Sequence, residues 1–264
     1  MRISADIVGR EIKPDRQEID LRWLMAYSAG LGERSETAHP LFPVCYEWPA
    51  TRQLREKAGL APIDARLVHA QHDLLLYRMP RAGDILSVSG KVVAAIQRRP
   101  GVLVVFRFTT LDVDGEPVST TDFSALYRDV VLDGGERRVA EVSDPPALSA
   151  KLEQVGEIAI ADTAAHVYTE CARIWNPIHT DVAYARAAGL PDIILHGTAT
   201  LAYSISRVLS AFQLKTVRRV RCRFAGMVTM PCTLHVHAAR AGEEIAFETR
   251  NERGGAVIER GWVS

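Results

Sequence analysis

The sequence is poor in several features that would assign a chain to a class at once. It holds only four cysteines in 264 residues, and none of them forms a Cys-x-x-Cys pair. That scarcity excludes a dense disulfide framework and favours free thiols in a reducing cytoplasm. The formal net charge is zero, so no overall field favours nucleic acid or an anionic membrane as a partner.

Long apolar runs are missing as well. No stretch reaches the roughly eighteen apolar residues that a membrane-spanning helix needs, and the first residues lack the apolar core of a secretory signal. The sequence also has no phosphate loop, dinucleotide fingerprint or nucleophile elbow. We therefore expect a cytoplasmic protein that is not a flavin, nicotinamide or serine-hydrolase enzyme.

What is present suits a globular chain of two ordinary domains. Hydrophobic residues make up 47% of the chain, which is enough for a core. A polar stretch that carries Pro145-Pro146 separates two halves of similar size. We predict an N-terminal domain over 1–135, a linker over 136–150 and a C-terminal domain over 151–264.

The two halves repeat one order of elements. A predicted helix lies at 46–58 in the first half and at 197–212 in the second, and alternating strands and a Met-Pro turn follow each. The second helix has apolar residues at helical spacing over a broad face, so we expect strands of its own half to cover it. One long helix with several antiparallel strands per half indicates an α+β fold.

Candidate functional residues gather in one run of about forty residues of the second half. Asn176-Pro177-Ile178-His179 places a histidine after a turn, and Ile194-Leu195-His196-Gly197 opens the long helix. An imidazole titrates near neutral pH, so His179 suits a general base. The free amides of a helix N-terminus, here at Gly197 and Thr198, suit an oxygen on which negative charge develops. The run therefore points to chemistry on a carbonyl compound.

These two motifs resemble the MaoC-like acyl dehydratase and (R)-specific enoyl-CoA hydratase family. The family carries Asn-Pro-(Ile/Leu)-His and then Pro-Ile-Leu-His-Gly. The first half is similar to the family's degenerate N-terminal domain at 39–43, at 67–71 and at 81–84. The resemblance implies two hotdog units, each a long helix wrapped by an antiparallel sheet, which pack as a pseudo-dimer with the site between them. Two residues depart from the family, because Ile174 stands where it carries its catalytic aspartate and Arg173 replaces the preceding glycine.

The resemblance implies a hydratase or dehydratase that acts on enoyl or 3-hydroxyacyl thioesters. His179 would be the base, Asn176 would orient the water or the histidine or cap the turn, and Glu170 is the nearest acid to replace the missing aspartate. Gly197 and Thr198 would polarise the thioester oxygen, and Trp175 and Arg173 would contact the substrate. No cofactor is expected beyond the coenzyme A or acyl carrier that bears the acyl group, and a homodimer of such chains remains open.

Several alternatives stay open at this point. His179 could work with another acid, could serve both steps through one water, or could belong to a site that binds a thioester without turning it over. A hotdog thioesterase is a further alternative. His235 and His237 share a strand face, but no third ligand is evident, so we expect no metal. The arginines at 219, 221 and 223 could meet coenzyme A phosphates or simply line a solvated sheet face.

Overall fold

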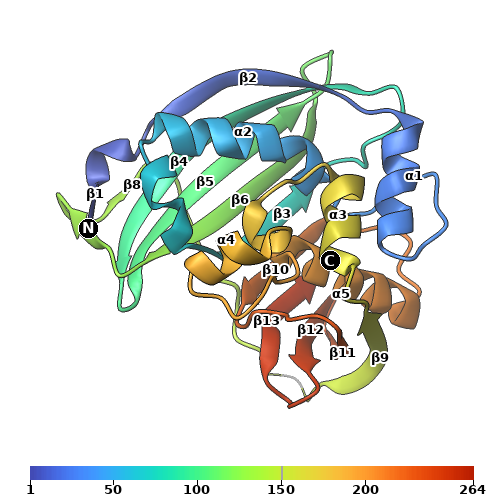
Figure 1. Cartoon of the computed structure of the whole chain (residues 1–264). Helices are drawn as coiled ribbons and strands as arrows, with labels where there is room; N and C mark the ends of the chain where they lie inside the picture. Colours follow the sequence, from blue (N-terminus) through green and yellow to red (C-terminus); the bar gives the residue numbers. More distant parts are fainter. Residues whose placement is uncertain (150) are drawn as a thin grey trace.

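The computed structural model describes residues 1–149 and 151–264. Its main feature is one continuous sheet of eleven strands, with helices gathered on one side of it (Figure 1). The strand order along the main path is β2-β4-β5-β6-β3-β10-β13-β12-β11-β9, and β8 pairs with β4. The first five strands on this path come from the first half of the chain and the last five from the second half. The sheet thus joins two similar units edge to edge.

The first unit contains most of the strand length of the molecule. Its helices and strands are β1 (Arg2–Ser4), the 3₁₀ turn η1 (Ala5–Ile7), β2 (Glu11–Glu18), α1 (Leu21–Gly30), α2 (Pro43–Lys57), the 3₁₀ turn η2 (Ala61–Arg66), β3 (Leu67–Leu76), β4 (Ile85–Arg98), β5 (Gly101–Leu111), β6 (Pro117–Arg128), β7 (Val131–Asp133) and β8 (Arg137–Arg138). The predicted helix 46–58 corresponds to α2, which packs on β4 and β5.

The second unit repeats this order and adds a turn-rich segment before its long helix. Its elements are β9 (Glu153–Ile160), α3 (Ala164–Ala172), the 3₁₀ turn η3 (Pro177–His179), α4 (Val182–Ala187), α5 (Gly197–Phe212), β10 (Arg219–Phe224), β11 (Cys232–Ala241), β12 (Glu244–Asn251) and β13 (Ala256–Val263). The predicted helix 197–212 is α5. It packs on β9, β11 and β12 of its own half, as expected from its apolar face.

The two units meet around a pseudo-twofold relation. The antiparallel pair β3–β10 joins their sheets, with Leu74 opposite Val220 and His72 opposite Cys222. The preceding helices α1 and α3 pack on each other, and the hydroxyls of Tyr27 and Tyr168 lie 3.3 Å apart. Each of these contacts therefore joins an element of the first unit to its counterpart in the second unit. The predicted α+β pair of helix-and-sheet units is the observed architecture.

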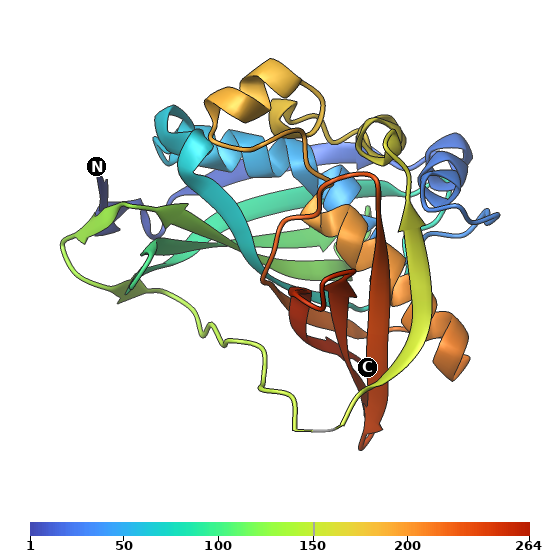
Figure 2. The ribbon, with the colours of Figure 1, turned by 60° about the horizontal axis from the view of Figure 1, so that its bottom comes forward.

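The segment between the units crosses the sheet face opposite the helices (Figure 2). Ala140 and Val142 pack there on a small apolar cluster of β4 and β5, and the indole of Trp262 donates to the carbonyl of Pro146 at 3.1 Å. Within the predicted linker 136–150, Arg137 and Arg138 form the short strand β8, and Ala150 lies outside the described residues. This path leaves the helical side of the sheet open for a cavity.

Candidate functional site

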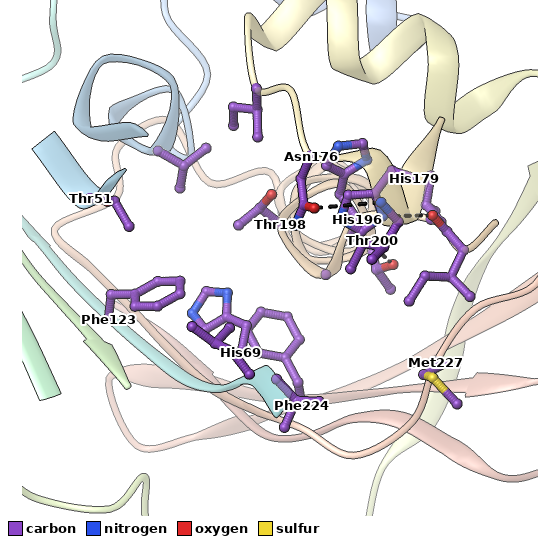
Figure 3. Close-up of a pocket in the computed structure, with 18 of the residues that line it drawn as sticks. Thr51, His69, Phe123, Asn176, His179, His196, Thr198, Thr200, Phe224 and Met227 are labelled. Carbon is purple, nitrogen blue, oxygen red and sulfur yellow. Dashed lines mark hydrogen bonds between the residues drawn. The ribbon is translucent and has the colours of Figure 1, made fainter. Parts of the chain in front are cut away.

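A cavity of about 550 Å³ lies between the two units, on the helical side of the sheet. Its wall includes α2 and strands β3 and β6 of the first half, and the segment 174–200 and β10 of the second. Figure 3 shows Asn176, His179, His196 and Thr198 on one side, with His69, Phe123 and Phe224 across from them. The volume suits a small-molecule ligand, and neither half could form this cavity alone.

His179 is held in one orientation within the cavity wall. Its Nδ1 lies 2.7 Å from the carbonyl oxygen of Ile194, and a carbonyl only accepts, so Nδ1 carries the proton. The ring stacks on His196 with the centroids 3.6 Å apart, and His196 Nε2 lies 3.3 Å from the hydroxyl of Thr169. Burial lowers the pKa of His179 to about 4. At neutral pH the imidazole is therefore uncharged, with Nε2 free to accept a proton.

The N-terminus of α5 also lines the cavity. The amide of Thr200 bonds to the carbonyl of His196, so the amides of Gly197 and Thr198 precede the first helical hydrogen bond. A Cβ at Gly197 would lie 3.3 Å from the ring of Phe224, so the absence of a side chain allows this close packing. Tyr168 donates its hydroxyl to Thr198 Oγ1 at 3.2 Å, which holds the Thr198 side chain in place. Two amide donors thus share the cavity with His179.

Asn176 and Trp175 also line the cavity, in different roles. Asn176 is the N-cap of η3, and its side-chain oxygen accepts from the amide of Ile178 at 3.5 Å. That bond holds the turn which presents His179. Trp175 is 57% exposed, and with Tyr184 and Met227, which are also exposed, it forms an apolar rim of the cavity.

Two residues predicted for the site lie outside the cavity wall. Glu170 is exposed on α3 and is not part of the lining. Arg173 lies in the left-handed region with φ of 56°, where its guanidinium covers the ring of Trp23 at 4.2 Å and approaches Asp20 at 3.5 Å. A glycine would adopt that backbone without strain, which accounts for the glycine implied at this position by the resemblance. Ile174 does line the cavity and is 5% exposed, so the expected place of the aspartate holds an apolar wall.

Sequence reasoning missed the carboxyl group of Glu47 in the cavity wall. Glu47 lies on α2, is 3% exposed and accepts a hydrogen bond from Thr121 Oγ1 at 2.7 Å. Burial raises the pKa of Glu47 to about 8, although the hydrogen bonds with Thr121 and Ser119 act in the opposite direction. An acidic residue within the apolar run 41–48 was the signal that could have drawn attention to it.

His69 and His72 also line the cavity, although the sequence predicts opposite faces for neighbours three apart in a strand. The pairing of β3 with β6 shifts register between His69 and Gln71, and this bulge brings both rings to one face, 5.5 Å apart. His69 packs between Phe123 and Phe224, and its Nε2 has no protein partner. His72 is 1% exposed, and neither of its ring nitrogens has a protein partner.

Other predicted features lie elsewhere. Among the described residues, no three His, Cys, Asp or Glu side chains are grouped to hold a metal, and no helix in those ranges is long and apolar enough to cross a membrane. Arg219, Arg221 and Arg223 each pair with a carboxylate on another strand of the sheet: Asp73 on β3, Glu244 on β12 and Glu259 on β13. None of the three lines the cavity, so the interpretation of a charged sheet face fits them.

Comparison with solved structures defines the class of fold. The chain superposes on a MaoC-like dehydratase from Phytophthora capsici with a TM-score of 0.85 at 19% identity, covering 97% of this chain and 95% of that one. It also superposes on a Mycobacterium tuberculosis protein described as a double hotdog, with a TM-score of 0.65 at 15% identity, covering 97% and 94% of the two chains. The protein is therefore a double hotdog protein.

Sequence comparison adds the family. Residues 145–260 match the model of the MaoC like domain. The 3-hydroxyacyl-thioester dehydratase X of Mycobacterium tuberculosis is 24% identical over 238 residues, which cover 89% of this chain and 82% of the relative. The peroxisomal multifunctional enzyme type 2 of Mus musculus is 28% identical, and this chain spans 29% of its length; the Neurospora crassa and Drosophila melanogaster relatives are spanned for 22% and 47%. The second half of the chain thus matches the MaoC like domain, and the predicted resemblance to that family is confirmed.

Proposed function

We propose that the protein hydrates α,β-unsaturated acyl thioesters, or dehydrates the corresponding 3-hydroxyacyl thioesters, in the cavity between its two units. One observation carries the proposal: His179, neutral and oriented through its Nδ1 proton, lines the same cavity as the first amides of α5. The relatives named as hydratases and dehydratases of thioesters support the same reaction class.

The proposed reaction assigns a task to each group. The amides of Gly197 and Thr198 donate to the thioester oxygen, where negative charge grows as water adds to the β-carbon. His179 Nε2 accepts a proton from that water, and the hydroxide adds to the β-carbon. The same imidazole then returns the proton to the α-carbon, so one water is added across the double bond and the base is restored. This single-base route needs no carboxyl group at Ile174.

The exposed rim of Trp175, Tyr184 and Met227 suggests where the carrier of the acyl group leaves the cavity. Coenzyme A or an acyl carrier arm, each joined to the acyl group through the thioester, would lie along this rim. Inside, apolar side chains from both units would surround the acyl chain.

A non-catalytic thioester-binding protein is the second candidate, and Ile174 favours it, because an apolar side chain there removes the acid that the family uses. Incubation with a panel of enoyl-CoA thioesters tests both. Hydration lowers the absorbance of the conjugated thioester and yields a 3-hydroxyacyl thioester. A thioesterase would release free thiol, and a binding protein would change neither signal while still binding the ligand. Absence of turnover across the panel would reject the proposed activity.

A further inference from the structure

The cavity has a second polar end that the proposed reaction does not use. The first unit contributes Glu47 from α2 and His72 from β3, both almost fully buried, and also His69, which Figure 3 shows beside Phe123 and Phe224. Together they offer one carboxyl group and two imidazoles. Buried polar groups of this kind normally have hydrogen-bond partners, because leaving one unpaired costs free energy.

These groups have more hydrogen-bonding capacity than the protein uses. Thr121 donates to Glu47 Oε1, and Ser119 also bonds to this carboxyl group, whereas both ring nitrogens of His72 and Nε2 of His69 lack protein partners. The ring of His69 lies against the rings of His72, Phe123 and Phe224. These unpaired nitrogens lie in the cavity wall with almost no accessible surface of their own, so an oxygen that enters this end of the cavity reaches them as the side chains adjust to it.

The charge state of this end restricts what it would accept. Burial raises the pKa of Glu47 to about 8, so its carboxyl is mostly protonated at neutral pH. Burial lowers the pKa of His72 to about 4 and that of His69 well below its usual value, so both rings are neutral. Three uncharged groups that both donate and accept suit a hydroxyl or keto oxygen better than a carboxylate or an ammonium group.

We propose that this end of the cavity, formed by Glu47, His72 and His69, binds an uncharged oxygen substituent on the acyl group, a hydroxyl or a keto oxygen remote from the thioester. Glu47 donates its carboxyl proton to that oxygen, and the imidazoles supply a second donor and an acceptor. The inference rests on the proposed function for the direction of the acyl chain, which runs from the α5 amides toward the first unit. It makes the protein selective for oxygenated acyl thioesters.

Binding tests this selectivity independently of turnover. The probes are octanoyl-CoA and a set of its derivatives, each with one hydroxyl at a different carbon from the middle to the end of the chain. Isothermal titration with the full-length protein should show that at least one derivative binds about tenfold more tightly than octanoyl-CoA, which is the size of one good buried hydrogen bond. If every derivative binds within twofold of octanoyl-CoA or more weakly, the proposal is overturned.

Three variants locate the effect. His72→Leu and Glu47→Leu should reduce the preference to about twofold or less, whereas Glu47→Gln, which still donates and accepts, should keep it. His237→Leu is the matched control, because His237 lies on β11 outside the cavity wall, and it should keep the full preference. Melting curves show which variants fold. If the leucine variants do not fold, the binding preference of the wild-type protein alone tests the proposal. A preference that survives both leucine substitutions in folded protein would overturn the proposal.

The outcomes separate this inference from the proposed function. Hydration of unsubstituted enoyl-CoA thioesters without any preference among the binding probes supports the proposed function and rejects the inference. A preference in binding without hydration of any enoyl-CoA, oxygenated or not, supports the inference and rejects the hydratase.

Discussion

The two hotdog units share an architecture but present different chemistry to one cavity. In the second unit, α5 begins with Gly197 and free amides, and the added segment 173–196 brings His179 beside them. In the first unit, α2 begins with Phe42-Pro43, so its first helical residue has no amide proton to donate. There the helix interior carries Glu47, and the bulge in β3 presents two neutral histidines. In the proposals above, the second unit polarises and protonates the substrate, and the first unit binds an uncharged oxygen substituent.

The sharpest way to break this comparison is to remove the base from the second unit. His179→Ala should lower kcat for any accepted enoyl-CoA by about two to four powers of ten, because no other group would accept the proton from water. The rate of hydration is measured from the loss of absorbance of the conjugated thioester. His166→Ala, an exposed histidine on α3, is the control. Near wild-type rates in the folded His179 variant would remove this residue from the mechanism.

Restoring the family's aspartate at Ile174 should increase the difference between the two units, because it adds an acid to the second one. Ile174→Asp should raise the hydration rate of a short enoyl-CoA by about tenfold or more, since a carboxyl group would share the proton transfers with His179. A buried, unpartnered carboxyl group costs a few kcal/mol of stability, so the melting temperature should fall. Ile174→Asn introduces a side chain of the same shape as aspartate but without an acidic group, and it should not raise the hydration rate. Should the aspartate slow a wild type that is already fast, the site works with a different acid.

The pH profile of the reaction tests the state of His179. A free histidine would lose its basic form as the pH falls through 6.5. Burial lowers the pKa of His179 to about 4, so at pH 5.5 and above the imidazole stays neutral and able to accept a proton. We expect kcat/KM for an enoyl-CoA to change less than about twofold between pH 8 and pH 5.5. A tenfold decline of kcat/KM centred near pH 6.5, with the protein still folded, would contradict the lowered pKa of His179.

The first unit has its own pH signature, in stability rather than rate. The pKa of Glu47 is raised from 4.5 to about 8, so between these values the folded state binds a proton that the unfolded state has lost. Stability therefore falls as pH rises through this window, by about 1.4 kcal/mol per pH unit for one such group. The buried histidines, with lowered pKa values, act in the opposite direction and only below pH 6.5.

The range from pH 6.5 to 8 consequently isolates the carboxyl group. Urea unfolding should give a free energy about 2 kcal/mol lower at pH 8 than at pH 6.5, and Glu47→Gln should remove most of that difference. Thr121→Val is a useful companion, because it deletes the hydrogen bond to Glu47 but leaves the carboxyl in place. An unchanged slope in the glutamine variant would mean that the pH dependence arises elsewhere.

The smallest effect is expected at Arg173, a residue of the second unit that contacts Asp20 and Trp23 of the first unit. Arg173→Gly relieves a left-handed backbone, worth about 1 kcal/mol, and loses an exposed ion pair with Asp20 and the contact with Trp23. These changes nearly cancel, so the free energy of unfolding should move by less than about 1 kcal/mol. The KM should also stay within twofold, since Arg173 does not line the cavity. A large rise in KM would return this arginine to the substrate site.

The sequence by itself determined the architecture and the part of the candidate site that the second unit provides. Apolar spacing predicted α5 over Gly197–Phe212, and alternation predicted β10 over Arg219–Phe224, because periodicity reports directly which face is buried. The motifs around His179 and Gly197 were found because the cavity residues of the second unit lie close together in the chain. The same proximity in the chain was the reason for choosing Glu170, which the structure places exposed on α3 and outside the cavity wall.

Only the tertiary structure decided what the first unit adds. Glu47, His69 and His72 come from α2 and β3, and the contact of the two units makes them part of a cavity whose other wall is more than a hundred residues away. The face of His69 depends on a bulge between β3 and β6, which a strict two-residue period does not reveal. Their charge states follow from burial, and burial is a property of the assembled sheet and helices rather than of any local pattern.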